Sequence, residues 1–327
     1  IHTDGPPFYK WFKGGKINTC YNALDRHVDE GNGDRVALIY DSAMTNTKKK
    51  FTYTELRDKT AELAGALQRF GIKKGDRIII YMPMIPEAIM AMLACGRIGA
   101  VHSVVFGGFA ANELAVRIDD ATPKAVITSS CGVERNNILP YLPILKDSFD
   151  IAKHTPESVF VLQRQEIHES SLPHDDFTGL NTTLYDFYDE IMKSNSVKCE
   201  PLNANDPLYI LYTSGTTGQP KGVLRDNTHV VPLQWTMDNF FNTKEGEGNI
   251  FGGANTFDLE GSFFGWGGAG GSVFIWSPEY DIGFAYTMTG MARYIVGGPR
   301  TKRIFSALCE CINMIDIYES SMDKVDL

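Results

Sequence analysis

Helix-like and strand-like segments alternate along residues 52–128, and this alternation restricts the fold more than any other feature of the sequence. The strand-like segments are short and apolar on both faces, as in Arg77-Ile-Ile-Ile-Tyr-Met82. Strands of this kind lie inside parallel sheets, because the crossover helices cover both faces. The pattern therefore predicts an α/β fold with largely parallel sheets and flanking helices. The predicted helices are residues 52–70, 86–98 and 112–119, and the predicted strands are 77–82, 100–105 and 124–128.

The first predicted helix has recognisable signals at both ends. Thr52 and Glu55 have the spacing of a capping box, in which each side chain accepts a hydrogen bond from the other residue's backbone N–H. Gly71 stands where a left-handed glycine commonly follows the last turn. We therefore expect an amphipathic helix with clear ends at residues 52–70.

A run of Thr, Ser and Gly follows the apolar residues 208–212 and ends at Pro220-Lys221-Gly222. Its hydroxyls and amides supply donors, Lys221 supplies a positive charge, and the glycines permit positive φ and close approach of a ligand. Such a loop suits an anion, most plausibly phosphate. It is not the Walker pattern, because Gly222 follows the lysine where Ser or Thr should stand. A solvated linker is the alternative from composition alone. The expected phosphate-binding residues are Thr213, Ser214, Gly215, Thr216, Thr217, Gly218, Lys221 and Gly222.

Charge and hydropathy argue against two kinds of partner. The formal net charge is −9, and the sequence has no basic stripe, so we expect no nucleic-acid surface. The most apolar region, residues 88–111, is interrupted by Arg97 and His102. A helix followed by a strand explains this region better than a membrane span.

The histidines and cysteines give weak signals. His168 and His174 stand among acidic residues, but such a run is better explained as a solvated loop than as a metal site, and we assign no metal ligand. His102 lies in an apolar strand and is expected to be a satisfied core histidine. The six cysteines are scattered, which favours free thiols in a reducing compartment over a disulfide framework.

Several motifs along the chain can be compared with a known family. They include Tyr21-Asn-Ala-Leu-Asp-Arg-His27, Ala94-Cys-Gly-Arg-Ile-Gly-Ala-Val-His102, Phe106-Gly-Gly-Phe109 and the loop that ends at Gly222. Together they resemble the short-chain acyl-CoA synthetases, the acetyl-CoA and propionyl-CoA synthetase branch of the adenylate-forming, or AMP-binding, ligases. The resemblance covers residues 8–247.

The resemblance implies a two-step ligase that uses ATP, Mg²⁺ and CoA. A small carboxylate, acetate or propionate, attacks the α-phosphate and releases pyrophosphate, and the CoA thiolate then displaces AMP. The resemblance implies that residues 214–218 bind the β- and γ-phosphates. It also implies that Lys221 is the catalytic residue that offsets their charge. It also implies a basic CoA site where Arg135 stands, although a surface arginine is the alternative.

The resemblance to the ligases ends near Glu247. A Tyr-Gly-x-Thr-Glu magnesium motif, a ribose-binding aspartate and a mobile lysine domain should follow, and we find none of them. Residues 257–313 resemble instead the C-terminal end of a serine β-lactamase-like protein, with Trp266-Gly-Gly268 as a strand bordering the active site. We therefore expect a partial AMP-binding domain at 1–247 and a foreign β-β-α tail at 248–327. A faulty gene model explains the join more simply than a natural fusion.

The leading interpretation is an AMP-forming short-chain acyl-CoA ligase by descent, weak or inactive as this truncated chain. The alternatives are a non-catalytic nucleotide-binding or scaffold fragment and a β-lactamase-like hydrolase, which would need a nucleophile motif, S-x-x-K, that we do not find. By resemblance we expect an intracellular protein, in the mitochondrial matrix rather than the cytosol. The expected partners are the carboxylate, ATP and CoA.

Overall fold

The computed structural model describes residues 10, 12–134, 137–165, 167, 177–213 and 220–228, together with the backbone of three strands between 264 and 286. The chain divides into two compact units, Ile1–Gln234 and Trp235–Leu327. Each unit is described by itself.

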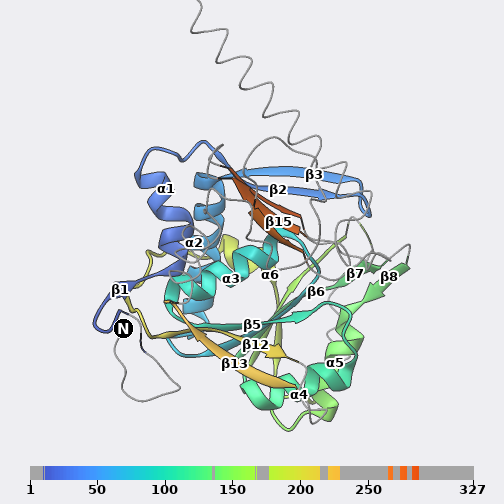
Figure 1. Ribbon diagram of the computed structural model, residues 1–327. Helices are drawn as coiled ribbons and strands as arrows, with labels where there is room; N and C mark the ends of the chain where they lie inside the picture. Colours follow the sequence, from blue (N-terminus) through green and yellow to red (C-terminus); the bar gives the residue numbers. More distant parts are fainter. Residues whose placement is uncertain are drawn as a thin grey trace, which may run out of the picture. The chain divides into compact units, whose positions relative to one another are not determined.

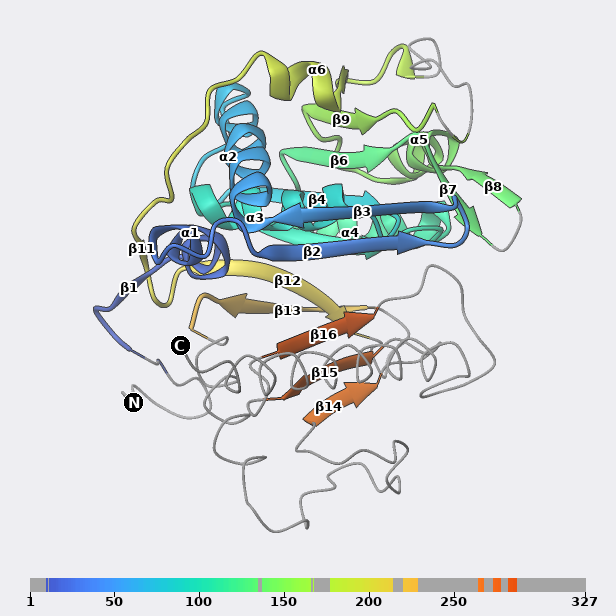
Figure 2. The same cartoon turned by 90° about the horizontal axis from the view of Figure 1, so that it is seen from above.

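The first unit is built on a seven-stranded sheet with the strand order β10-β9-β6-β4-β5-β12-β13 (Figure 2). All neighbouring pairs are parallel except β12 and β13, which are antiparallel. The largely parallel α/β fold expected from the alternation is thus confirmed. The strands are β4 (Arg77–Met82), β5 (Val101–Phe106), β6 (Ala125–Ser129), β9 (Ser158–Leu162), β10 (Thr183–Asp186), β12 (Pro207–Thr213) and β13 (Lys221–Asp226).

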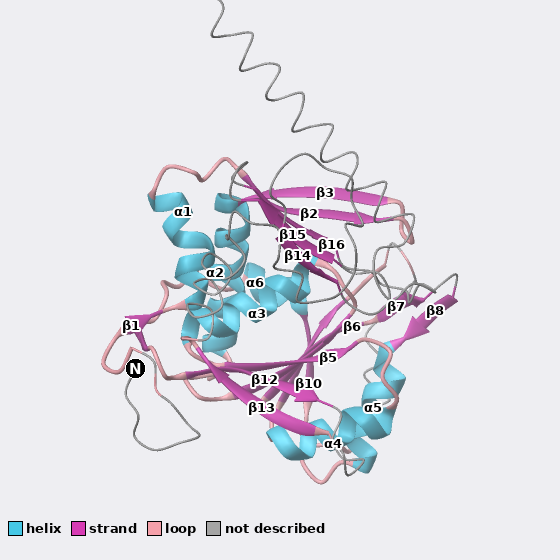
Figure 3. Ribbon diagram, in the orientation of Figure 1, coloured by secondary structure: helices cyan, strands magenta, loops and turns pink. Residues whose placement is uncertain are grey.

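Helices cover both faces of this sheet (Figures 1 and 3). The chain passes from β4 to β5 on one side and then crosses to β6 on the other, and right-handed crossovers in opposite directions place their helices on opposite faces. One face carries α2 (Tyr53–Arg69), α3 (Pro86–Ile98) and α6 (Phe187–Met192), and the other carries α4 (Ala111–Ala121) and α5 (Tyr141–Ile151).

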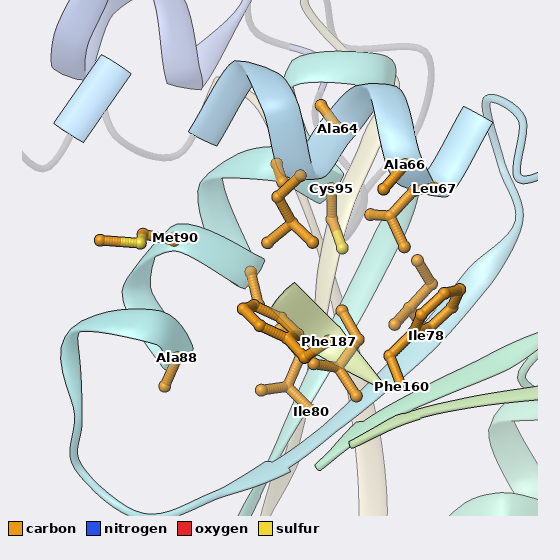
Figure 4. Packing of buried hydrophobic residues seen from close by; sticks show 14 of the residues in the cluster. Ala64, Ala66, Leu67, Ile78, Ile80, Ala88, Met90, Cys95, Phe160 and Phe187 are labelled. Atoms are coloured by element: carbon orange, nitrogen blue, oxygen red, sulfur yellow. The ribbon is translucent and has the colours of Figure 1, made fainter. Parts of the chain in front are cut away.

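Each face of the sheet has its own hydrophobic core, because alternate residues of a strand point to opposite sides. Ile78 and Ile80 of β4 pack beneath α2 and α3 with Leu67, Cys95 and Phe160 (Figure 4). Their neighbours Ile79 and Tyr81 pack on the other side. The residues that complete this second core include Leu114 and Ile118 of α4 and Leu142, Leu145 and Phe149 of α5.

The helix signals in the sequence act as predicted. Thr52 caps α2 in a complete capping box: its hydroxyl accepts from Glu55 N, and the Glu55 carboxylate accepts from Thr52 N. Gly71 has a φ of 76°, in the left-handed region that this position requires. The helix α3 spans the predicted residues 86–98, with a proline in its first turn and the left-handed Gly99 at its end.

Smaller elements lie around the main sheet. One hairpin consists of β2 (Val36–Ser42) and β3 (Thr47–Thr52), and a second consists of β7 (Cys131–Glu134) and β8 (Asn137–Pro140). A further two-stranded pair is formed by β1 (Lys16–Ile17) and β11 (Leu202–Asn203). A π-helical turn η1 (Tyr21–Asp25) leads into the short α1 (Arg26–Asp29). Within the described residues, no helix is long and apolar enough to cross a bilayer.

The second unit contains a three-stranded antiparallel sheet of β14 (Phe264–Gly267), β15 (Val273–Ser277) and β16 (Ile282–Tyr286). The prediction of two strands in this tail was therefore wrong by one strand. The predicted final helix lies outside the described residues.

Candidate functional site

The predicted phosphate loop is framed by two paired strands. The antiparallel ladder of β12 and β13 ends with Thr213 opposite Lys221, and Tyr212 is opposite Gly222. The backbones of directly opposed residues are about 5 Å apart, so Thr213 and Lys221 form the two sides of the loop's mouth. Both residues are exposed. Among the residues that the structure describes, Lys221 has no carboxylate partner, so its ammonium group is available to an anionic ligand.

The mouth of the loop lies at the carboxyl end of the parallel sheet. β12 runs parallel to β5 with Tyr209 opposite His102, and the same register carried along both strands places Thr213 level with Phe106. Ligands of open α/β sheets bind outside the carboxyl ends of the strands. The position of Thr213 and Lys221 is thus the one where such a sheet normally holds its ligand.

The turn after β5 lies at the same edge and depends on two glycines. Gly108 has a φ of 97°, which side chains rarely adopt. A Cβ on Gly107 would lie 2.3 Å from the Tyr141 hydroxyl oxygen. The Phe106-Gly-Gly-Phe109 motif is therefore needed to bring the chain closely past α5 at this edge of the sheet.

Helix α4 fixes the position of β12 from one face of the sheet. The Tyr212 hydroxyl donates a 2.6 Å hydrogen bond to Asp120 Oδ2. Arg117 lies over the Tyr212 ring, 5.4 Å from its centroid, and its Nη1 is 2.8 Å from Glu113 Oε2. Burial, together with the hydrogen bond to Asp120 and its negative charge, raises the pKa of Tyr212. Tyr212 therefore stays protonated and keeps donating at neutral pH.

Gly222 has a different backbone conformation from the one predicted. It was expected to take up positive φ in the loop, but it lies in β13 and is not in the left-handed region. A Cβ at this position would lie 3.2 Å from each of three atoms, which belong to Asp120, Ile210 and Tyr212. The absence of a side chain thus allows β13 to pack closely beside the Tyr212–Asp120 contact.

The other face of β5 and β12 is apolar and partly open. His102 is buried, with its ring 5.6 Å from that of Tyr209. Val104 and Phe106 follow on the same face of β5 and are 40% and 48% exposed, and Leu211 of β12 is 51% exposed. Exposed apolar side chains thus continue from His102 towards the mouth of the loop.

The prediction that His102 is a satisfied core histidine is confirmed only in part. Burial lowers its pKa to about 4, so the ring is neutral at pH 7, as in a core histidine. Its Nδ1, however, has no hydrogen-bond partner within the described part of the chain. His102 is therefore a buried but unsatisfied histidine.

The structure describes only some of the predicted site residues. It brings together Thr213, Lys221 and Gly222, while Ser214, Gly215, Thr216, Thr217 and Gly218 lie outside the described residues, as do Arg135, His168 and His174. β7 and β8 flank the position of Arg135, with Glu134 opposite Asn137. The support from α4 was not predicted from the sequence. Its signal was the spacing of Glu113, Arg117 and Asp120, which places the three residues on one helix face.

Comparison with known proteins places the chain in a family. Residues 24–279 match the family model described as AMP-binding enzyme, and residues 1–23 match that of the acetyl-coenzyme A synthetase N-terminus. The chain belongs to the AMP-binding enzyme family. The first match includes residues 248–279, part of the segment that we expected to be foreign, and the β-lactamase-like character of the tail stays a prediction.

Two relatives and one solved structure illustrate the similarity. The chain is 48% identical over 243 residues to the mitochondrial acyl-CoA synthetase short-chain family member 3 of Bos taurus, covering 74% of this chain and 34% of that protein. It is 44% identical over 220 residues to an acetyl-coenzyme A synthetase of Pasteurella multocida. This match covers 67% of this chain and 32% of that protein. The solved structure of the acetoacetyl-CoA synthetase from Streptomyces lividans shares the fold, with a TM-score of 0.61 and 23% sequence identity. The matched region covers 71% of this chain and 34% of that chain. The chain spans about a third of the length of these relatives.

Proposed function

We propose that this chain carries the ATP-phosphate site of an AMP-forming short-chain acyl-CoA ligase, with acetate or propionate as the acyl substrate. The observation that carries the proposal is the pairing of Thr213 with Lys221 at the carboxyl end of β12. The similarity to a short-chain acyl-CoA synthetase and to an acetyl-coenzyme A synthetase supports the choice of reaction.

The reaction has two displacements, and both depend on positioning charged groups. In the first, a carboxylate oxygen attacks the α-phosphorus of ATP and pyrophosphate leaves. In the second, the CoA thiolate attacks the acyl carbonyl carbon and AMP leaves. Preorganised donors and positive charge lower such barriers, because negative charge moves onto the leaving group.

The described residues would contribute a fixed position for the positive charge. Lys221 begins β13, and the Tyr212–Asp120 hydrogen bond holds the paired strand against α4. Lys221 would neutralise the departing pyrophosphate, while the hydroxyls and amides of residues 213–218 would donate to its oxygens. We give Arg135 the weaker role of binding CoA phosphate.

Mg²⁺, when bound with ATP in this family, supplies further neutralisation of the phosphates. Mg²⁺ prefers oxygen ligands, commonly carboxylates. Asp120, whose carboxylate lies close to Gly222 near the end of this ladder, already accepts the Tyr212 hydroxyl. The described residues therefore suit the phosphates better than the metal, and we assign them no magnesium ligand.

Substitution of Lys221 tests the proposal. In Lys221→Ala we expect ATP affinity, measured by calorimetry, to fall roughly 10- to 150-fold, because one charge-assisted contact of about 1.5–3 kcal/mol is lost. Lys59→Ala is the matched control, since Lys59 is an exposed lysine on α2. Equal ATP affinity in the wild type and Lys221→Ala would contradict the phosphate site.

Turnover is measured separately, because we propose that the chain alone is a weak or inactive ligase. Acyl-adenylate formation from ATP and acetate or propionate is followed by exchange of labelled pyrophosphate into ATP. We expect little exchange beside tight ATP binding, and any exchange should fall about 10²-fold in Lys221→Ala. Exchange at an ordinary enzymatic rate would contradict the inactivity, and ATP binding without any exchange would favour a non-catalytic nucleotide-binding fragment.

We also propose a mitochondrial location, because a relative described as mitochondrial shares 48% identity. Immunodetection of the protein in purified mitochondria of its source would test this. Detection in the cytosolic fraction alone would contradict it.

A further inference from the structure

Two cysteines that are far apart in the sequence meet beside a buried ion pair. Cys20 directly precedes η1, and Cys199 lies on the segment between α6 and β11. The two sulfurs and a carboxylate oxygen of Asp25 all lie within 4.8 Å of one another. Cys20 is fully buried and Cys199 is half-buried, so the pair can be reached from the Cys199 side.

Arg97 of α3 organises this group of side chains. Its guanidinium is 4% exposed and binds both carboxylate oxygens of Asp25, at 2.7 and 2.8 Å. Its Nη1 also donates to Cys20 Sγ at 3.4 Å, and the Cys199 thiol donates to Asp25 Oδ2 at 3.5 Å. Both sulfurs are thus held by the same ion pair.

The backbone around each cysteine is also fixed to α3. The Asn18 side chain donates to the carbonyls of Gly96, Arg97 and Glu200. The Glu200 N–H donates to the Arg97 carbonyl at 2.8 Å. Because these bonds hold both segments against one helix end, the closeness of the two sulfurs is a property of the fold and not of one rotamer.

The surroundings shift the pKa values of the two thiols in opposite directions. The hydrogen bond from Cys199 lowers the pKa of Cys20, burial opposes this, and the positive charge of Arg97 adds to the lowering. The same hydrogen bond and burial raise the pKa of Cys199. By contrast, burial alone raises the pKa of Cys95 to about 12. A more acidic thiol beside a second thiol favours thiol–disulfide exchange.

We propose that Cys20 and Cys199 are a redox modification site that forms a reversible disulfide bond. A small-molecule disulfide, such as oxidised glutathione, is the oxidant. The Cys199 thiol loses its proton to solvent, its sulfur attacks one sulfur of this disulfide, and the first small thiolate leaves and takes up a proton. The Cys20 thiol then loses its proton to solvent, and its sulfur attacks the Cys199 sulfur and expels the second small thiolate, which also takes up a proton. Two protein thiols are oxidised and one small disulfide is reduced to two thiols.

A metal ion fits the same group of side chains less well. Arg97 already occupies both oxygens of Asp25 and one lone pair of the Cys20 sulfur. A cation placed between these ligands would lie beside the guanidinium and be repelled by it. Oxidation needs no such cation, because it joins the two sulfurs directly.

The disulfide would act on the chain segment that leads to the phosphate loop. Residues 199–206 run from Cys199 through β11 to the start of β12, which ends at Thr213. Forming the bond withdraws Cys20 from Arg97 and Cys199 from Asp25, and it closes a long loop in the unfolded chain. We therefore expect the oxidised protein to melt several degrees higher than the reduced protein.

Peptide mapping tests this site. The chain is oxidised with oxidised glutathione, remaining thiols are alkylated, and the non-reduced digest is analysed by mass spectrometry. The expected result is a peptide pair linked between Cys20 and Cys199 that disappears after reduction. Cys131→Ser, a buried cysteine outside the pair, should leave the link intact, and Cys199→Ser should abolish it.

Three outcomes would overturn the proposal. One is recovery of Cys20 and Cys199 as alkylated thiols after oxidation, and another is a stable glutathione adduct on Cys199 with Cys20 still reduced. The third is one tightly bound Zn²⁺ per reduced chain that is lost in Cys199→Ser, which would make the group a metal site. Since the linked peptide is sought in the wild-type chain, the test does not depend on whether a variant folds.

Discussion

Two buried basic residues of the first unit, Arg97 and His102, differ in their charge and in their hydrogen-bond partners. Arg97 is paired with Asp25 and also donates to the Val197 carbonyl at 2.6 Å, so its charge is fully compensated. His102 is buried in β5 without a partner for Nδ1 among the described residues. A buried charge without a partner is costly, and the histidine avoids this cost by remaining neutral.

The neutral state of His102 predicts a pH-dependent stability. Its pKa is lowered by burial from 6.5 to about 4, so below pH 6.5 the unfolded chain binds a proton that the folded chain does not. The contribution of His102 is fully present above pH 6.5 and is lost as the pH falls towards 4. Between pH 7 and pH 4.5 we expect a loss of about 2 kcal/mol from this residue.

Urea unfolding at both pH values measures this loss. His102→Gln cannot titrate, so its free energy of unfolding should change about 2 kcal/mol less over this interval than that of the wild type. The carboxylates of the protein titrate in both proteins and cancel in the comparison. An identical pH dependence in the variant would contradict a buried neutral His102.

At the scale of helices and strands, α2 and α3 each contain a glycine that their helical propensity does not explain. Gly65 lies within α2, and Gly96 lies near the end of α3. A Cβ on Gly65 would lie 1.9 Å from the backbone oxygen of Asn195, whereas a Cβ on Gly96 would meet only a Leu208 methyl group at 3.3 Å. The first neighbour is rigid backbone and the second is the end of a flexible side chain.

Alanine substitutions should therefore have different effects at the two positions. Alanine favours a helix by about 1 kcal/mol over glycine, which should leave Gly96→Ala within about 1 kcal/mol of the wild type. In Gly65→Ala the clash outweighs this gain, and we expect a net loss of about 1–3 kcal/mol. Thermal or urea unfolding of the pair gives the comparison. Equal stability of the two variants would show that the 195–199 segment does not pack rigidly on α2.

These elements also show what the sequence could predict. The bounds of α3 and the ends of α2 follow from local signals, a proline, a capping box and left-handed glycines, and all of them act as predicted. The meeting of Cys20 with Cys199, and of Tyr212 with Asp120, depends on strand order and helix packing, which no local pattern contains. At the site, the motif identified Thr213 and Lys221 but not the helix that holds their strands in place.

At the scale of the whole chain, the hydrophobic cores of the described residues lie in one part of the sequence. Both described cores are made of residues between Cys20 and Ile191, all within the unit Ile1–Gln234. Domains fold alone when they contain their own core. This unit therefore has the interior that an independent domain requires.

A fragment ending at residue 234 should consequently fold without the rest of the chain. Its urea midpoint, followed by far-ultraviolet circular dichroism, should match that of the main transition of the whole chain, because the same cores are disrupted in both.

Three of the four tryptophans, at 235, 266 and 276, belong to the second unit. Tryptophan fluorescence of the whole chain therefore reports mainly on that unit, and its transition should not coincide with the one seen by circular dichroism. Coincident transitions, or a clearly lower midpoint of the fragment, would mean that the second unit completes the core of the first, and the phosphate loop would then have to be studied in the whole chain.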